Sequence, residues 1–199
     1  MHVHLATPPW TCDVSLLSEE ERAIAARFVF ERDRTLYLAA HAFLHATLTA
    51  YLGRNPLFAR DANGRPELSD RTLRFNLSHT EGMVAVAVTR EADVGVDVER
   101  IRPVDDLLAK AVFTAEELHA WPGDARSFFE RWTLKEAYVK ARGRGLSIDL
   151  QSFGFAGDRL VCSDDDANAW SSFTLAPTAA HRAAVVVRDA AARLTVVEP

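Results

Sequence analysis

The 199-residue sequence lacks the features that would assign it at once to several large classes. Its two cysteines, Cys12 and Cys162, have no CxxC spacing, so we expect free thiols rather than a disulfide or a metal clip. No apolar run is long enough to span a membrane, and the first residues do not open a signal peptide. The net charge is −5, and the sequence has no long run of Lys and Arg that could follow a nucleic-acid backbone. We therefore expect a cytoplasmic protein that binds neither membrane nor nucleic acid.

What is present is ordinary globular composition, with 48% hydrophobic and 26% charged residues. Within it, residues 128–140 form the most informative stretch. They contain no Gly or Pro, and the next glycine is Gly143, so a helix is predicted that ends near residue 142. One face of this helix carries Trp132, Glu136 and Lys140. Lys135 lies one step to the side. A carboxylate flanked by two ammonium groups could bind a metal and phosphate groups, whereas the alternative is a plain amphipathic helix with a Glu–Lys pair.

A second acidic element is the predicted strand at residues 94–99. Its three valines face one way, and Asp97 and Glu99 face the other. These carboxylates lie about 7 Å apart, from the ~3.3 Å rise per strand residue, which suits a shared divalent cation. A solvated outer face is the alternative. Gly95 in the middle of the strand is unfavourable for β structure. Residues that are unfavourable for their local structure often occur where function requires them.

The histidines carry weaker signals. His41 and His45 have the i, i+4 spacing of a zinc pair, but the Glu of an HExxH motif is missing, so we interpret them as structural. His2, His4 and Cys12 could look like metal ligands, but scattered residues of this kind near a terminus are more often incidental. Residues 78–82, which include His79, are interpreted as the polar connection of a β-hairpin.

The two parts of the chain echo each other at an offset of about 98 residues. Phe30-Glu31-Arg32 recurs as Phe129-Glu130-Arg131, and capping boxes that begin at Ser18 and Thr114 precede the two copies. We predict an α+β fold of two similar halves, residues 1–93 and 94–199, related by a pseudo-twofold axis. The polar residues are not duplicated, which favours one composite site at the interface of the halves.

Four motifs occur together in the sequence: Gly-Arg-Pro at 64–66, Phe-Asn-Leu-Ser-His at 75–79, Gly-Val-Asp-Val-Glu at 95–99, and Trp-Thr-Leu-Lys-Glu-Ala-Tyr-Val-Lys at 132–140. With these motifs the chain resembles the 4′-phosphopantetheinyl transferases, of the double-length type that acts on carrier proteins of polyketide and nonribosomal-peptide synthesis. The resemblance implies transfer of 4′-phosphopantetheine from coenzyme A to a serine of an apo acyl or peptidyl carrier protein, with release of 3′,5′-ADP. It implies Mg²⁺ as cofactor, with Mn²⁺ as an alternative. A monomer with internal pseudo-twofold symmetry is expected. The alternative is a non-catalytic relative that binds carrier protein or nucleotide without turnover.

The resemblance also implies roles for individual residues. The expected metal ligands are Asp97, Glu99 and Glu136. Glu136 is further the candidate general base, and Lys140 is expected to neutralise developing phosphate charge. The residues expected to bind coenzyme A are Arg34, Thr35, Arg65, Ser78, His79, Lys135 and Lys140. One departure is the acidic first helix at residues 19–21, where related enzymes often carry basic residues that reach the 3′-phosphate.

Overall fold

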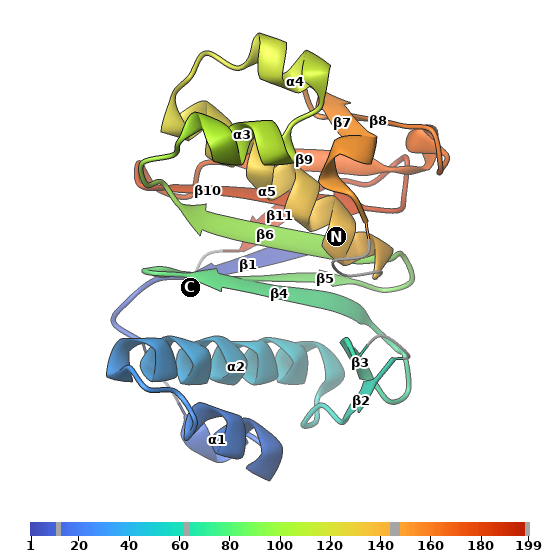
Figure 1. The fold of residues 1–199 in the computed structure, drawn as a ribbon. Coiled ribbons are helices and arrows are strands. Elements are labelled where there is room, and N and C mark those ends of the chain that lie inside the picture. The colour runs from blue at the N-terminus through green and yellow to red at the C-terminus, as the bar shows by residue number, and fades with distance from the viewer. Residues whose placement is uncertain (11–12, 62–63, 144–147, 198–199) are drawn as a thin grey trace.

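The computed structural model describes residues 1–10, 13–61, 64–143 and 148–197, and it shows the predicted α+β architecture in two halves (Figure 1). The first half contains β1 (His2–Ala6), α1 (Glu19–Ala25), α2 (Glu31–Leu52), β2 (Phe58–Arg60), β3 (Pro66–Leu68), β4 (Arg74–Thr80) and β5 (Met83–Thr89). The second contains β6 (Val94–Arg100), α3 (Asp106–Val112), α4 (Ala115–Ala120), α5 (Ala125–Arg142), β7 (Phe153–Ala156), β8 (Arg159–Cys162), β9 (Ser171–Leu175), β10 (His181–Val187) and β11 (Thr195–Val197). Single-turn 3₁₀ helices lie at Val14–Leu16, Leu150–Ser152 and Ala167–Ala169.

The strand order repeats from one half to the other. The first sheet runs β1-β5-β4 and the second runs β6-β10-β9, so corresponding strands occupy corresponding places. A short hairpin precedes the last two of these strands in each half, β2-β3 in the first and β7-β8 in the second. The last strand, β11, crosses back and pairs in parallel with β1, which makes the first sheet four-stranded. The C-terminal segment is thereby anchored in the sheet of the first half.

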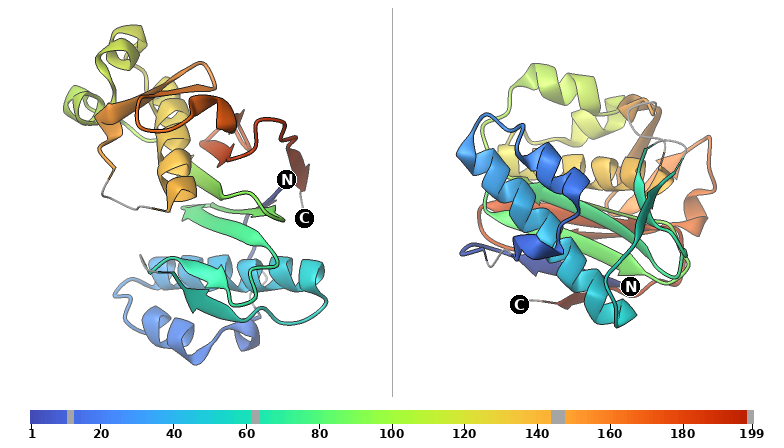
Figure 2. Two further views of the ribbon diagram at one scale, coloured as in Figure 1. Left: turned by 90° about the vertical axis from the view of Figure 1, so that its right-hand side faces the viewer. Right: turned by 90° about the horizontal axis from the view of Figure 1, so that it is seen from below.

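The elements stack in four layers, with a long helix on each outside and the two sheets between them (Figures 1 and 2). Helix α2 packs on the outer face of the first sheet through Leu44 and Leu48. Helix α5 packs on the outer face of the second through Leu134 and Tyr138. Between the sheets lies a fully apolar cluster that includes Val94, Val96 and Val98, as the alternation of that strand predicts. The opposite face of β6 is therefore turned toward α5.

Gly95 permits the closest approach of α5 to this face of β6. A Cβ atom at Gly95 would lie 2.0 Å from the Ala137 carbonyl oxygen and 2.5 Å from the Ala141 nitrogen. Both are backbone atoms of α5, so the conflict could be relieved only by moving the helix. The glycine that breaks β preference in the sequence is thus required by helix packing, which brings the side chains of α5 over the acidic face of the strand.

We predict that Gly95→Ala destabilises the fold by about 3 kcal/mol or more, because overpacking against backbone has no cheap relaxation. Gly154→Ala is the matched control. There the new methyl group would approach only side-chain atoms of Glu117 and Thr114, at 3.2 Å, so a loss of about 1 kcal/mol is expected. Urea denaturation of both variants measures the difference, and equal losses would contradict the steric argument.

Both predicted capping boxes are present, and the glutamate of the first one also holds α1 against α2. Its carboxylate accepts the backbone N–H of Ser18 at 2.8 Å, and it accepts hydrogen bonds from His41 at 2.8 Å and His45 at 3.0 Å. Burial alone would raise the pKa of Glu21, but the hydrogen bonds from His41, His45 and Ser18 outweigh it, so the pKa falls far below its ordinary value. His41 and His45 therefore have the structural role predicted for them.

We predict that Glu21→Gln lowers stability by about 2 kcal/mol at pH 7, since hydrogen bonds to a charged acceptor are lost. Because the pKa of Glu21 is lowered in the folded state, its contribution is complete above its ordinary value of 4.5 and declines as the pH falls below it. Urea denaturation from pH 7 to about pH 3 measures this trend. Glu20→Gln is the control. Glu20 lies on the same helix as Glu21 and forms an exposed ion pair with Arg60 of β2, so this change should alter stability little at any pH. A constant difference between wild type and Glu21→Gln would contradict the assignment.

Candidate functional site at the seam of the two halves

Strands β4 and β6 run side by side where the halves meet, and side chains bridge them. The side-chain oxygens of Asn76, Ser78 and Thr80 accept the backbone N–H groups of Val96 at 2.9 Å, Val98 at 3.3 Å and Arg100 at 3.3 Å. These bonds satisfy strand donors that would otherwise lack partners. The expectation that residues 78–80 belong to a hairpin connection is wrong, because they continue β4 and pair with β5 as far as Thr80 and Met83.

Three of the predicted site residues meet at this seam, each from a different element. Lys140 of α5 donates hydrogen bonds to Asp97 Oδ1 at 2.6 Å, to Ser78 Oγ at 3.0 Å and to the Val96 carbonyl at 3.2 Å. Ser78 of β4 donates to the same Asp97 oxygen at 3.0 Å. Asp97 of β6 is only 5% exposed. The structure therefore brings a carboxylate, an ammonium group and a hydroxyl group together between the halves.

The other oxygen of Asp97 and the neighbouring carboxylates determine which ligand fits here. Asp97 Oδ2 is buried and has no hydrogen-bond partner. The pKa of Glu136 is raised by burial and by the negative charge of Asp97 and Glu99, with Lys140 acting in the opposite direction. Glu99 pairs with Arg102 at 2.8 Å. The described residues contain no three His, Cys, Asp or Glu side chains already arranged around a metal position. An unsatisfied oxygen beside mutually repelling carboxylates is nevertheless a donor set that fits a hard divalent cation.

Arg65 crosses the seam, but its acceptors are backbone carbonyls. Its guanidinium donates to the carbonyls of Lys140 at 2.9 Å, Phe75 at 3.0 Å and Val94 at 2.9 Å. It thus joins the start of β4, the start of β6 and the last turn of α5. The planar fork of arginine suits several acceptors at once. In this arrangement Arg65 positions the strands and helix that carry the site, whereas the sequence predicts a phosphate contact.

Three other predicted ligands of coenzyme A, His79, Arg34 and Thr35, lie on the side of β4 that faces α2, or on α2 itself. His79 is exposed, yet surrounding protein atoms desolvate its ring, and the nearby His41 and Lys140 add positive charge, so its pKa is lowered. Arg34 and Thr35 lie near the start of α2, which begins at Glu31. Arg34 pairs there with Glu31.

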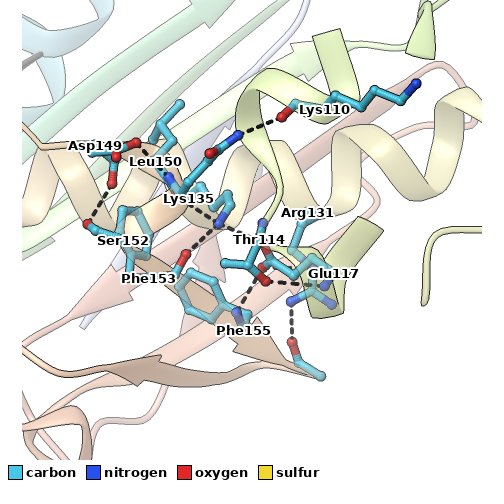
Figure 3. Close-up of polar contacts among 12 residues, drawn as sticks. Lys110, Thr114, Glu117, Arg131, Lys135, Asp149, Leu150, Ser152, Phe153 and Phe155 are labelled. Carbon is cyan, nitrogen blue, oxygen red and sulfur yellow. Dashed lines mark hydrogen bonds and ion pairs between the residues drawn. The ribbon is translucent and has the colours of Figure 1, made fainter. Parts of the chain in front are cut away.

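Lys135 does not join the seam, although it is adjacent to Glu136 in sequence. Figure 3 shows its side chain beside Glu117, Leu150 and Phe153. Its side chain has no exposed surface, and its ammonium group contacts Glu117 Oε2 at 2.6 Å, the Leu150 carbonyl at 2.9 Å and the Phe153 carbonyl at 2.6 Å. All of its donors are engaged inside the second half. Lys135 therefore has no donor left for the phosphate contact that the sequence predicts.

Glu117 is the partner that the sequence does not reveal. Its carboxylate also accepts the backbone N–H of Thr114 at 3.1 Å, as a capping box requires, and that of Phe155 at 2.9 Å (Figure 3). Arg131 lies 3.6 Å from the same carboxylate. The capping box predicts only the contact with Thr114, because nothing in the local sequence indicates that the carboxylate reaches α5 and β7.

The fold and the seam define a duplicated α+β protein with one acidic site between its halves. The sequence family described as "4′-phosphopantetheinyl transferase superfamily" matches residues 93–191, and "4′-phosphopantetheinyl transferase, N-terminal" matches residues 6–91. The protein is 33% identical over 173 residues to putative 4′-phosphopantetheinyl transferase slr0495 of Synechocystis sp., an alignment that covers 78% of this chain and 70% of that protein. The chain belongs to the 4′-phosphopantetheinyl transferase superfamily.

Two further relatives are more similar over a shorter span. 4′-Phosphopantetheinyl transferase HetI of Nostoc sp. is 39% identical over 145 residues, which covers 66% of this chain and 61% of HetI. 4′-Phosphopantetheinyl transferase psf-1 of Bacillus pumilus is 34% identical over 146 residues, which covers 69% of this chain and 62% of psf-1. The chain thus spans less than two thirds of the length of these two relatives. No helix in the described part of the chain is long and apolar enough to cross a membrane.

We predict that Lys135→Met destabilises the fold by about 3 kcal/mol, because it leaves the buried carboxylate of Glu117 without its nearest cation. Adding Glu117→Gln should recover at least about 1 kcal/mol, since the amide carries no charge and its single oxygen still accepts one of the two backbone N–H groups. Lys110→Met, on the surface of α3, is the control and should be close to neutral. A double-mutant cycle by chemical denaturation measures the coupling, and strictly additive effects would contradict a buried ion pair.

Proposed function

We propose that this protein transfers the 4′-phosphopantetheine group of coenzyme A to a serine hydroxyl of an apo acyl or peptidyl carrier protein and releases 3′,5′-ADP. Membership of the superfamily supports the reaction class. The observation that carries the proposal is the meeting of Lys140, Asp97 and Ser78 at the seam, with one Asp97 oxygen left without a partner. A diphosphate donor needs such a combination of cationic, hydroxyl and metal-binding groups in one place.

Asp97, Glu99 and Glu136 are the residues that would hold Mg²⁺, with Mn²⁺ as an alternative. Oxygen donors of this kind match the preference of both ions, and the unpartnered Asp97 oxygen offers a ligand without first breaking a hydrogen bond. When bound, the cation would neutralise charge on the diphosphate under attack. Glu99 would first have to exchange its pairing with Arg102.

Glu136 is the proposed general base. It would take the proton of the carrier serine as the serine oxygen forms a bond to the phosphorus that bears the pantetheine arm. The bond from this phosphorus to the oxygen of 3′,5′-ADP breaks in the same exchange. The pKa of Glu136 is raised by burial and by the charges of Asp97 and Glu99. A bound cation would offset those charges, so burial is the cause that would still favour proton uptake by Glu136.

Lys140 and Ser78 are the proposed contacts to the donor phosphates. The Lys140 ammonium group already lies at the seam, so it can offset negative charge on the departing diphosphate oxygen without moving into the site. Ser78 offers a hydroxyl donor from the neighbouring strand, and His79, Arg34 and Thr35 extend the proposed binding surface toward α2. We propose that Arg65 contributes by holding the last turn of α5 and the first residues of β4 and β6 together.

The two halves are proposed to act as one unit, with the boundary between residues 93 and 94. The pseudo-twofold arrangement places a single seam within one chain, so a monomer would suffice for the reaction. The family-model matches end and begin at nearly this point, at residues 91 and 93. Cytoplasmic placement would match the small-molecule donor and the carrier acceptor.

We predict that wild-type protein incubated with an apo carrier protein, coenzyme A and Mg²⁺ adds one phosphopantetheine group, measured by intact mass spectrometry. Asp97→Asn and Glu136→Gln should each lower kcat/KM by at least about 100-fold, the usual cost of removing one group that stabilises transition-state charge. Glu116→Gln, an exposed carboxylate on α4, is the matched control and should retain activity.

Two outcomes would contradict these assignments in different ways. Coenzyme A binding by the wild type without a mass gain on several carriers would indicate a non-catalytic relative. Full activity of Asp97→Asn, with the variant correctly folded by circular dichroism, would show that the seam is not where the reaction occurs.

A further inference from the structure

A second group of metal-ligating side chains lies on β1 and at the end of α2, away from the seam. His4 Nε2 lies 2.7 Å from the Tyr51 hydroxyl oxygen, and His2 Nδ1 hydrogen-bonds the same oxygen. The two imidazole rings are 6.4 Å apart between centroids and approach Tyr51 from neighbouring positions on one strand face. Two ring nitrogens therefore lie within hydrogen-bonding distance of one phenolic oxygen.

The internal repeat explains why the fold places side chains together at His2, His4 and Tyr51, a group that we call a niche. His4 pairs with Val86 of β5, and Asp97 pairs with Ala184 of β10, at the same place in the two corresponding strands. His4 thus occupies in the first half the register position that Asp97 occupies in the second. His4 lies under the last turns of α2, which is capped by Gly53, and Asp97 lies under the last turns of α5, which is capped by Gly143.

The positions two residues earlier in each strand show how the niche at His4 and the niche at Asp97 differ. His2 pairs with Val88, and Gly95 pairs with Val186, so His2 and Gly95 also correspond. In the second half the glycine lets α5 rest on the strand. In the first half a histidine stands there, and Tyr51 of α2 reaches its ring. One niche of the duplicated scaffold is thus lined by carboxylates and an ammonium group, and the other by imidazoles and a phenol.

We propose that His2, His4 and Tyr51 form a second metal site that takes a borderline divalent transition metal such as Zn²⁺. Two histidines separated by one residue on a strand point the same way and can chelate one ion. Imidazole nitrogen suits Zn²⁺, Cu²⁺ and Ni²⁺ and does not suit Mg²⁺, so this site selects against the ion proposed for the seam. In the described residues no third His, Cys, Asp or Glu completes the set, which makes the Tyr51 oxygen the third donor and leaves a coordination position open.

The surroundings of the niche give an ion access to it. His2 and Tyr51 line an open cavity of about 680 Å³, which offers a path for a hydrated ion and room for a water or a further ligand.

The test is titration of the full-length protein with Zn²⁺ by calorimetry in the presence of excess Mg²⁺, with Co²⁺ absorption as a second measurement. One Zn²⁺ per chain is expected, together with Co²⁺ bands of a low-coordinate nitrogen and oxygen site. His2→Gln and His4→Gln should each weaken the Zn²⁺ Kd by at least about tenfold, because loss even of an outer-shell partner costs 10–100-fold. Tyr51→Phe should weaken it less and change the Co²⁺ spectrum.

Two matched controls separate this site from the other imidazole and carboxylate groups. His119→Gln removes an exposed histidine on α4, and His41→Gln removes one from the cluster with Glu21; both should leave the Zn²⁺ Kd unchanged. The proposal is overturned if Zn²⁺ binding survives His2→Gln/His4→Gln in a folded protein. It is equally overturned if binding is abolished by His41→Gln or by Asp97→Asn, since the ion would then lie at α2 or at the seam.

Discussion

The structure depends on a seam where two parallel strands are joined by side chains instead of by a backbone ladder. Asn76, Ser78 and Thr80 supply the acceptors that the N–H groups of β6 require. Side chains hold the strands further apart than direct backbone pairing would, and the space between them admits other polar groups. Lys140 enters this space and contacts both strands. The same requirement, that buried polar atoms find partners, therefore joins the halves and assembles the site.

Much of the site could be predicted because its residues lie on regular elements. Strand alternation places Asp97 and Glu99 on one face, and helix periodicity places Glu136 and Lys140 on one face, so both groups follow from spacing alone. The contacts of Lys135 and Arg65 could not be predicted. Lys135 turns toward Glu117, which is 18 residues away along the chain, and Arg65 binds carbonyl oxygens that leave no mark in the sequence. A side chain's direction within a helix is readable from sequence, whereas its tertiary partner is not.

The duplication reuses one device with different chemistry. In each half the third helical residue of a capping box is a glutamate that also holds the following long helix, through His41 and His45 in the first half and through Lys135 in the second. The contact between the capping-box glutamate and the long helix is repeated because both halves have the same arrangement of helices. The partner differs: one buried ammonium group donates to the carboxylate in the second half, and two histidines donate to it in the first. Scaffold residues can therefore diverge without moving the helices that carry the site.

The two oxygens of Asp97 have different surroundings, and this separates Asp97 from a carboxylate that only forms a structural ion pair. A buried carboxylate that served stability alone would have both oxygens bonded, as Glu117 has, because an unsatisfied buried acceptor costs about 1–3 kcal/mol. Asp97 has one oxygen bonded to Lys140 and Ser78 and the other bonded to nothing. Nearby Glu99 and Glu136 add negative charge, and the raised pKa of Glu136 records the repulsion. The proposed cation would remove this cost, so the unbonded oxygen, and not the ion pair beside it, is the strongest structural support for the proposed metal site at the seam.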